Sequence, residues 1–389
     1  MTVKISKPAI NVREELADLK KPTGIAGEAM LRAETPQEQQ ALIGVGRRNM
    51  LYNGAMVISQ RGTSETFTTA GQEYVLDRFY KVNGSSYAPN ITMSQQADAP
   101  SGFTYSLKVN VDAVTTPASN QNLLIGQSLE GYDVAQLGYG TADAKSITLS
   151  FWVKANQTGS RGVYIMTQDA NREYLAEYTI NNSATWEYKT VTIPPNTIGG
   201  PNIDNTTGIL VLWPLSTGSG DKIDASTGWE QNGAYRGLSG EPDLCNTVGN
   251  YFQITGVQLE LGKVATPFEH RSYGEELALC QRYYQKIGAV ARVSFGTAVA
   301  HTSGTVFCPV RFMTTMRTTP SQSHNGSENF YVTGSNQNQS PPSGQTFGTE
   351  GININGVTLS VPCSVTVGNG YWFNTKADAV GYIAWDAEL

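Results

Sequence analysis

Two stretches of the chain alternate apolar and polar residues with a period of two, and this pattern constrains the fold more than any other feature. In FTYSLKVNV (103–111) and SITLSFWVKA (146–155), every second side chain is apolar. Such alternation predicts antiparallel strands that bury one face and leave the other in solvent. Further strands are predicted in GVYIMTQ, WEYKTVTIP, GILVLWPL and NYFQITGVQLELG. Many strands without a helical period between them predict a jelly-roll β-sandwich over residues 49–271.

The strand predicted at 250–262 contains a change of phase. Its apolar residues switch from Phe252 and Ile254 to Val257, Leu259 and Leu261. A slip of one residue at Thr255–Gly256 predicts a β-bulge, because the extra residue shifts the alternation.

Residues 1–48 carry the signals of two short helices. Asn11 with Glu14, and Thr35 with Glu38, have the spacing of capping boxes. Neither helix has enough apolar surface to be stable alone in water. We therefore predict that this segment is ordered by docking to a partner, with a flexible tail as the alternative.

Residues 288–389 are again predicted to be β, as a small sandwich. VSFGTAVAHTSGTVFCPV predicts two strands joined across Thr302–Ser303–Gly304, and SVTVGNGYWFN predicts two strands joined across Asn369–Gly370. GYIAWDAEL predicts one last strand. The polar stretch at 324–347 is expected to form loops.

A single helix is predicted over 272–287, between the two β regions. Ser272 and Glu275 form a capping box at its start. An apolar stripe follows at spacings of three, four and three, formed by Leu277, Cys280, Tyr284 and Ile287. The stripe allows two interpretations: a helix packed on its own β domain, or the seam of a threefold helical collar.

The pair Glu269–His270 lies at the entrance of this predicted helix. Neighbours on an extended stretch point to opposite faces, and catalysis would need a second acid or a nucleophile aimed at the pair. We therefore expect a local polar pair at a joint and no catalytic residue.

The composition excludes several classes of protein. The net charge of −6 argues against a nucleic-acid binder, which needs a basic face. No stretch has the apolar length for membrane insertion, and the first residues do not form a secretory signal. Synthesis in a cytoplasm is expected, so the four widely spaced cysteines are expected to be free thiols: Cys245, Cys280, Cys308 and Cys363. No metal site or cofactor is predicted.

A long stretch without strand periodicity, 213–246, supplies candidate ligand-binding residues. Aromatic rings stack on sugar rings, while carboxylates and guanidinium groups bond sugar hydroxyls. The candidates for glycan binding are Trp229, Tyr235, Arg236, Asp221 and Asp224. The alternative is that these aromatic residues pack inward as anchors, in which case Tyr331 and the 324–347 loops are the next candidates.

Four motifs resemble those of bacteriophage tail fibres and related receptor-binding proteins, especially of short-tailed phages. They are GRRNMLYNGAMVISQRGTS (46–64), SITLSFWVKANQTGSRGVYI (146–165), GVQLELGKVATPFEHRSYGEELALCQRYYQK (256–286) and the final DAEL. The resemblance implies an elongated homotrimer with an N-terminal virion anchor, a carbohydrate-binding-like jelly roll and a distal tip. It also implies buried or inter-domain hydrogen bonds from Arg61 and Arg271, which match motif positions.

The resulting expectation is a mainly β tail-fibre subunit with segments 1–48, 49–271, 272–287 and 288–389. It would be made in the host cytoplasm, attach to the phage tail or an adaptor through residues 1–48, and bind a host surface glycan without cleaving it. The alternatives are a glycan-cleaving tail-spike depolymerase, which would need two matched carboxylates, and a purely structural tail component.

Overall fold

The computed structural model describes residues 47–389 apart from 85, 170, 232–235, 335–337, 340 and 342–345. The predicted docking segment lies outside the described residues except for Arg47 and Arg48. No helix in the described part has the length and apolar character needed to cross a membrane.

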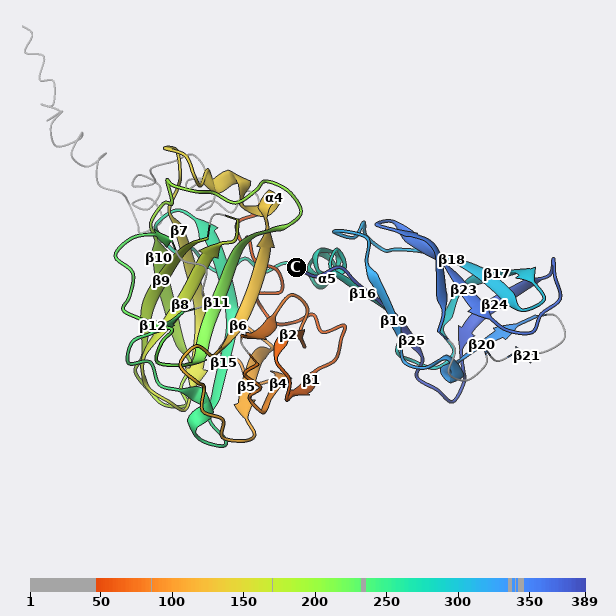
Figure 1. Ribbon diagram of the computed structural model, residues 1–389, viewed down its shortest axis with the longest axis horizontal. Coiled ribbons are helices and arrows are strands. Elements are labelled where there is room, and N and C mark those ends of the chain that lie inside the picture. The colour runs from red at the N-terminus through yellow and green to blue at the C-terminus, as the bar shows by residue number, and fades with distance from the viewer. Residues whose placement is uncertain are drawn as a thin grey trace, which may run out of the picture.

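The larger of two β units is a sandwich of two antiparallel sheets, as predicted (Figure 1). The six-stranded sheet comprises, in spatial order, β1 (Ser64–Phe67), β4 (Ile91–Gln96), β5 (Ser106–Val111), β15 (Tyr251–Leu261), β7 (Ile147–Ala155) and β10 (Glu187–Ile193). The seven-stranded sheet comprises β13 (Glu230–Gln231), β9 (Arg172–Ile180), β8 (Gly159–Thr167), β11 (Thr207–Thr217), β6 (Asn122–Glu130), β3 (Tyr80–Asn83) and β2 (Gly71–Tyr74). Short elements complete the unit, namely α4 (Gly131–Val134), 3₁₀ turns at Ala135–Leu137 and Leu244–Asn246, and the parallel pair β12 (Lys222–Ile223) and β14 (Gly237–Leu238).

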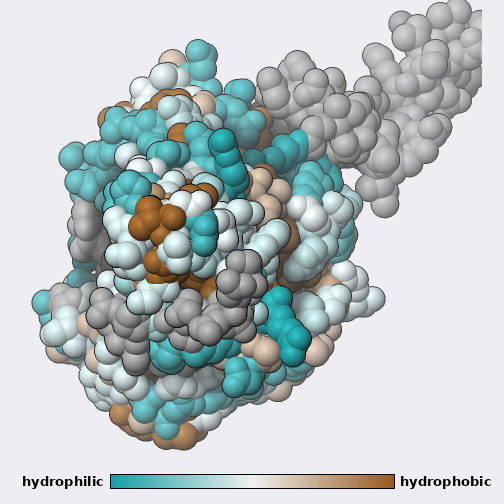
Figure 2. Space-filling model, turned by 90° about the vertical axis from the view of Figure 1, so that its right-hand side faces the viewer, coloured by the Kyte–Doolittle hydropathy of each residue, from teal (hydrophilic) through white to brown (hydrophobic). Residues whose placement is uncertain are grey.

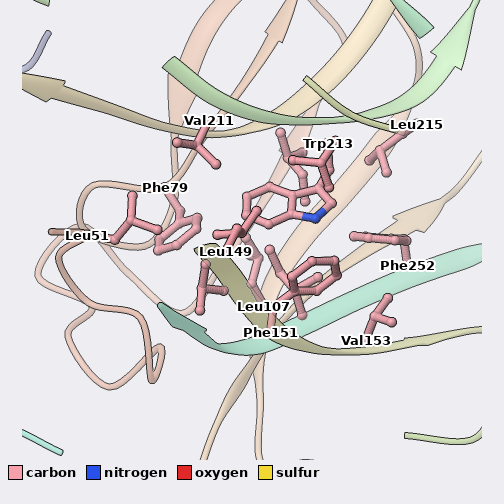
Figure 3. Packing of buried hydrophobic residues seen from close by; sticks show 14 of the residues in the cluster. Leu51, Phe79, Leu107, Leu149, Phe151, Val153, Val211, Trp213, Leu215 and Phe252 are labelled. Carbon is pink, nitrogen blue, oxygen red and sulfur yellow. The ribbon is translucent and has the colours of Figure 1, made fainter. Parts of the chain in front are cut away.

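The core between the sheets follows the alternation of the sequence. Leu149, Phe151 and Val153 of β7 are fully buried, and Phe151 packs edge-on against Trp213 of β11 with ring centroids 5.3 Å apart (Figure 3). Each large apolar side chain buried in this way contributes about 1.5–3 kcal/mol.

The predicted β-bulge is confirmed. The register between β15 and β7 shifts between Thr255 and Gln258, and Gly256 has a φ of 59°. A Cβ on Gly256 would lie 2.6 Å from the ring of Phe103, so both the backbone conformation and the close approach require glycine.

The smaller unit is also built of β-strands and lies to the right in Figure 1. Its seven-stranded sheet comprises β21 (Asn338–Gln339), β20 (Phe330–Thr333), β24 (Gly370–Thr375), β17 (Ser294–Thr302), β18 (Thr305–Arg311), β23 (Gly356–Pro362) and β22 (Gly348–Asn353). A three-stranded sheet comprises β16 (Tyr284–Gly288), β25 (Tyr382–Asp386) and β19 (Ser321–His324), with a 3₁₀ turn at Ser327–Asn329. Figure 2 looks onto this end of the molecule, where a small apolar patch interrupts a mostly hydrophilic surface.

One of the two hairpins predicted in this unit is confirmed and the other is wrong. β17 and β18 pair across the turn at Ser303–Gly304. The stretch 364–369 is not a strand, and β24 pairs with β17 and β20 instead. Distant partners override the Asn-Gly turn signal, since the N–H of Val365 donates to the carbonyl of Ser303 at 3.0 Å.

The connecting helix is shorter than predicted. α5 spans Tyr273–Gln281, and Ser272 caps it by accepting a hydrogen bond from the N–H of Glu275. Tyr284 and Ile287 belong to β16, which pairs with β25 from Tyr284 opposite Asp386. The predicted stripe is therefore not one helical face, because pairing with β25 converts its second half into strand.

The last residues of the sequence return to the larger unit and join the two. Glu388 forms ion pairs with Arg61 at 3.2 Å and with Arg78. The carbonyl of Leu389 accepts hydrogen bonds from Gln72 at 2.6 Å and from Tyr74 at 2.9 Å. The C-terminal end accordingly lies between the units in Figure 1.

The four cysteines are free and buried, as expected: Cys245, Cys280, Cys308 and Cys363.

Candidate functional site

The stretch 213–246, predicted to carry the glycan site, begins within β11, which continues to Thr217, and the described residues after it pack in part over the outer face of the seven-stranded sheet. Leu238 joins an apolar cluster on that face with Tyr164, Leu175 and Leu212, all of which are buried. The ring of Trp229 packs against Tyr139 and Tyr174, with centroids 5.5 and 5.9 Å away.

Trp229 is an anchor, as the alternative interpretation of this segment expected. Its indole Nε1 donates to the carbonyl of Pro194 at 2.7 Å, and the ring is half-buried. These contacts favour the anchor interpretation, and the assignment of Trp229 to glycan binding stays a prediction.

The other predicted residues are only partly brought together. Arg236 lies 3.9 Å from carboxylate oxygens of both Asp221 and Glu173. Asp224 is exposed, and Tyr235 lies outside the described residues. The assignment of these residues to glycan binding stays a prediction.

A buried ion pair fastens the same segment to the sheet. The side chain of Glu241 lies 3.7 Å from Arg161 of β8, and both side chains are buried. Burial raises the pKa of Glu241 to about 7, against the opposing effect of Arg161.

A more open aromatic surface lies on the outer face of the six-stranded sheet. Trp152 of β7 pairs in register with Tyr188 of β10, and their ring centroids are 5.4 Å apart. Tyr188 is 45% exposed and Trp152 is half-buried. We call this face, including Trp186 just before β10, the aromatic surface.

A row of polar side chains crosses the sheet beside the aromatic surface. Gln253 of β15 lies in register with Lys154 of β7 on one side and Lys108 of β5 on the other. Asp98, from the loop after β4, reaches over this row. Its carboxylate accepts hydrogen bonds from Lys154 at 2.7 Å, Trp186 at 3.2 Å and Gln253 at 3.4 Å.

This arrangement has the chemistry of a sugar-binding face. Exposed aromatic rings offer apolar surface to a pyranose ring, and the neighbouring ammonium, amide and carboxylate groups can bond hydroxyls. Sequence reasoning missed these residues because it sought the site in the long loop. The sequence pattern could have identified them. Trp152 and Tyr188 stand at strand positions where the alternation places polar, outward-facing residues, so their rings face solvent.

Among its described residues, the smaller unit also has an exposed aromatic ring. Trp372 of β24 is 56% exposed and lies opposite Thr297 of β17. Tyr331 of β20 lies on the same face, opposite Asn374, and is half-buried.

The pair Glu269–His270 has structural contacts. The carboxylate of Glu269 accepts the backbone N–H groups of Arg48 at 3.1 Å and Asn49 at 2.6 Å. His270 is exposed and packs against the rings of Phe103 and Phe268.

The two motif arginines make the bonds that the resemblance implied. The side chain of Arg271 is 3% exposed and donates to the carbonyls of Asn49 and Leu51. Arg61 donates to Asp386 at 2.9 Å, across the two units.

Comparison with known proteins gives no family for the chain. None of the protein-family models matches it, and none of the curated proteins matches it either.

Solved structures that are similar to part of the chain include a phage protein and sugar-binding modules. The enzymatically active domain of tailspike protein 4 from bacteriophage CBA120 is 13% identical, with a TM-score of 0.29 over 55% of this chain, which spans 21% of that domain. The family 11 carbohydrate-binding module of Clostridium thermocellum, in complex with a β-1,3-1,4-mixed-linked tetrasaccharide, is 11% identical, with a TM-score of 0.27 over 52% of this chain and 98% of the module. The module TmCBM61, in complex with β-1,4-galactotriose, is 11% identical, with a TM-score of 0.26 over 56% of this chain and all of the module, 100%. Likeness at this level leaves function to be argued from this chain's own residues.

Proposed function

We propose that the protein is a phage tail-fibre subunit that binds a glycan of the host surface through the aromatic surface of its sandwich. The observation that carries this proposal is the pair of the half-buried Trp152 and the exposed Tyr188, beside the polar row of Lys108, Gln253 and Lys154. The virion location rests on the resemblance of its sequence motifs to tail fibres. Attachment through residues 1–48 and assembly as a homotrimer belong to the same proposal.

The glycan would be held without being cut. Glycoside hydrolysis needs a carboxyl group that is still protonated near neutral pH. Hydrogen bonding from Lys154 holds the pKa of Asp98 below its usual range. For Glu187, burial would raise the pKa, but bonds from Lys189 and from the N–H groups of Asn181 and Asn182 lower it to about 2. Both carboxylates are therefore ionised near neutral pH, and Glu187 lies on the opposite face of β10 from Tyr188, in register with the buried Val153, so neither is suited to act as the acid.

Binding of the purified protein to host surface polysaccharide tests the proposal. Trp152→Ala and Tyr188→Ala should each weaken binding by about tenfold, because a stacked aromatic ring contributes on the order of 1 kcal/mol or more. Trp372→Ala is the control, since it removes a ring that is 56% exposed from the other unit.

The same samples test the absence of cleavage. The polysaccharide should keep its chain length after prolonged incubation, as measured by size-exclusion chromatography. Shortened chains would support the depolymerase alternative, and loss of binding only in Trp372→Ala would move the site to the smaller unit.

A further inference from the structure

We infer that the aromatic surface takes an acidic glycan, and that Asp98 occupies in the free protein the position of a carboxylate of that glycan. The inference rests on the proposed function and adds the chemical class of its ligand. It is carried by three hydrogen-bond donors that converge on one exposed carboxylate.

The donors belong to the rigid frame of the sandwich. Lys154 is in β7, Gln253 is in β15 and Trp186 directly precedes β10. Gln253 is 2% exposed, so packing fixes its side chain. The Lys154 side chain is 18% exposed, so most of it is also held by its surroundings. An ammonium, an amide and an indole N–H directed at one place form a receptor for a carboxylate.

The carboxylate that fills this receptor belongs to a loop and is much more exposed. The Asp98 side chain is 48% exposed. Its backbone is held independently, because the Ser106 hydroxyl donates to the Asp98 carbonyl at 2.7 Å. Rotation of the side chain alone is thus sufficient to free the three donors.

Exchange of one carboxylate for another is favourable in this setting. An ion pair at an exposed site is weakened by water and salt, so little is lost when Asp98 leaves. A sugar carboxylate would make the same three bonds, while its ring gains contact with Trp152 or Tyr188. The ligand therefore adds stacking to bonds that the protein already makes with itself.

A second cation favours an acidic ligand over a neutral one. Lys108 lies in the same row, on the other side of Gln253, with its ammonium 4.6 Å from the centre of the Tyr251 ring. Among the described residues Lys108 has no carboxylate partner. The other acidic group on the β5 side, Asp112, is already bonded to Thr92 and Asn110.

The experiment compares two probes of matched length, an oligogalacturonate and a neutral β-1,4-galacto-oligosaccharide, titrated into the full-length protein. The wild-type protein should prefer the oligogalacturonate. Asp98→Ala should tighten binding of the acidic probe by up to about fivefold and leave the neutral probe unchanged, because it frees donors from an exposed ion pair for a charged acceptor. Lys154→Met should weaken binding of the acidic probe by a similar factor.

Asp112→Ala is the control for net charge, since it removes an equal charge from the same face without freeing the receptor. Equal tightening of acidic-probe binding by Asp112→Ala and Asp98→Ala would overturn the inference. It would also be overturned if the wild-type protein bound both probes equally and Asp98→Ala changed neither affinity. Failure of the proposed function looks different. In that case neither probe would bind, or Trp152→Ala would leave binding of both unchanged.

Discussion

Two guanidinium groups that are removed from water show how single residues hold this molecule together. Arg61 lies between the rings of Tyr74 and Tyr284, 4.8 and 3.7 Å from their centres. Arg78 is fully buried and lies 3.5 Å over the ring of Tyr283. Both share Glu388 as an ionic partner. A buried cation without its ionic partner is costly, so the stability of the fold depends strongly on the Glu388 carboxylate.

Replacing Glu388 with Gln should lower the free energy of unfolding by about 3–5 kcal/mol, because Arg78 would stay buried with its charge uncompensated. Denaturant unfolding followed by tryptophan fluorescence measures the change. Glu350→Gln, at an exposed position of β22, is the control and should change stability by less than about 0.5 kcal/mol. Equal stability of the two variants would contradict the role assigned to Glu388.

The buried carboxyl of Glu241 should make stability depend on pH. Its pKa is raised to about 7 in the folded protein, so the folded state holds a proton that the unfolded chain has already lost. Stability should therefore fall as pH rises from about 4.5 to about 7, by at most about 3 kcal/mol, and level off above that range.

Thermal unfolding of the wild-type protein and Glu241→Gln across this pH range tests the point. The variant should lose this component of the slope, whatever its stability at a single pH. A parallel pH profile in both proteins would show that Glu241 titrates normally.

At the scale of elements, α5 is the part most suited to contact another copy of the chain. Cys280 faces inward and is fully buried, so it cannot form the predicted seam. Tyr273 is 63% exposed, Ala278 is exposed and Leu277 is half-buried. These three residues lie on the solvent side of the helix, at spacings of four and one. We propose that this side of α5, and not the predicted stripe, forms the trimer contact.

Leu277→Asp should convert the proposed trimer into monomer, because three carboxylates would meet in an apolar contact. Light scattering gives the mass directly. Val114→Asp, at a valine that is 55% exposed in the sandwich, should leave the mass unchanged. A monomeric wild-type protein, or a trimer that tolerates Leu277→Asp, would exclude this contact.

The sequence correctly predicts elements that are determined by the local residue pattern. It fails where pairing with residues far away in the chain determines the structure. The alternation around Phe151 and Val153 is enough to identify β7 and its buried face, because few structures besides a half-buried strand produce a period of two. The helical spacings of three and four also continue to Tyr284 and Ile287. These two residues nevertheless form a strand, because they pair with β25, which lies some hundred residues further along the chain. The outward rings of Trp152 and Tyr188 are visible in the pattern, but their neighbour Asp98 depends on how a loop folds back.

At the scale of the whole molecule, the two β units are connected by α5, by β16 and by the last residues. Arg282 of the α5 end bonds Glu130 of β6 through both carboxylate oxygens, each at 2.7 Å. Arg317 of the smaller unit donates to the carbonyl of Asn205 at 2.8 Å. Side-chain hydrogen bonds therefore join the two units in addition to the chain itself.

Removal of residues 1–45 should leave both units folded and abolish incorporation into particles. The physical reason is that these residues contribute the only segment proposed to dock on the virion, while the sandwich core lies elsewhere. Circular dichroism reports the folding, and immunoblotting of purified virions reports incorporation. Normal incorporation of the shortened chain would refute the docking assignment.

The placement of Glu388 and Leu389 inside the larger unit has a consequence for biosynthesis. A ribosome releases residues in order, so Arg61 and Arg78 are made more than three hundred residues before their shared partner, which lies 310 positions beyond Arg78. Until Glu388 has been made, Arg78 lacks its carboxylate partner, and the sandwich should be less stable than in the full-length protein. A chain interrupted anywhere upstream would keep this defect permanently and remain open to proteases. The fold thereby makes the stability of the sandwich depend on a residue that is made 310 positions after Arg78.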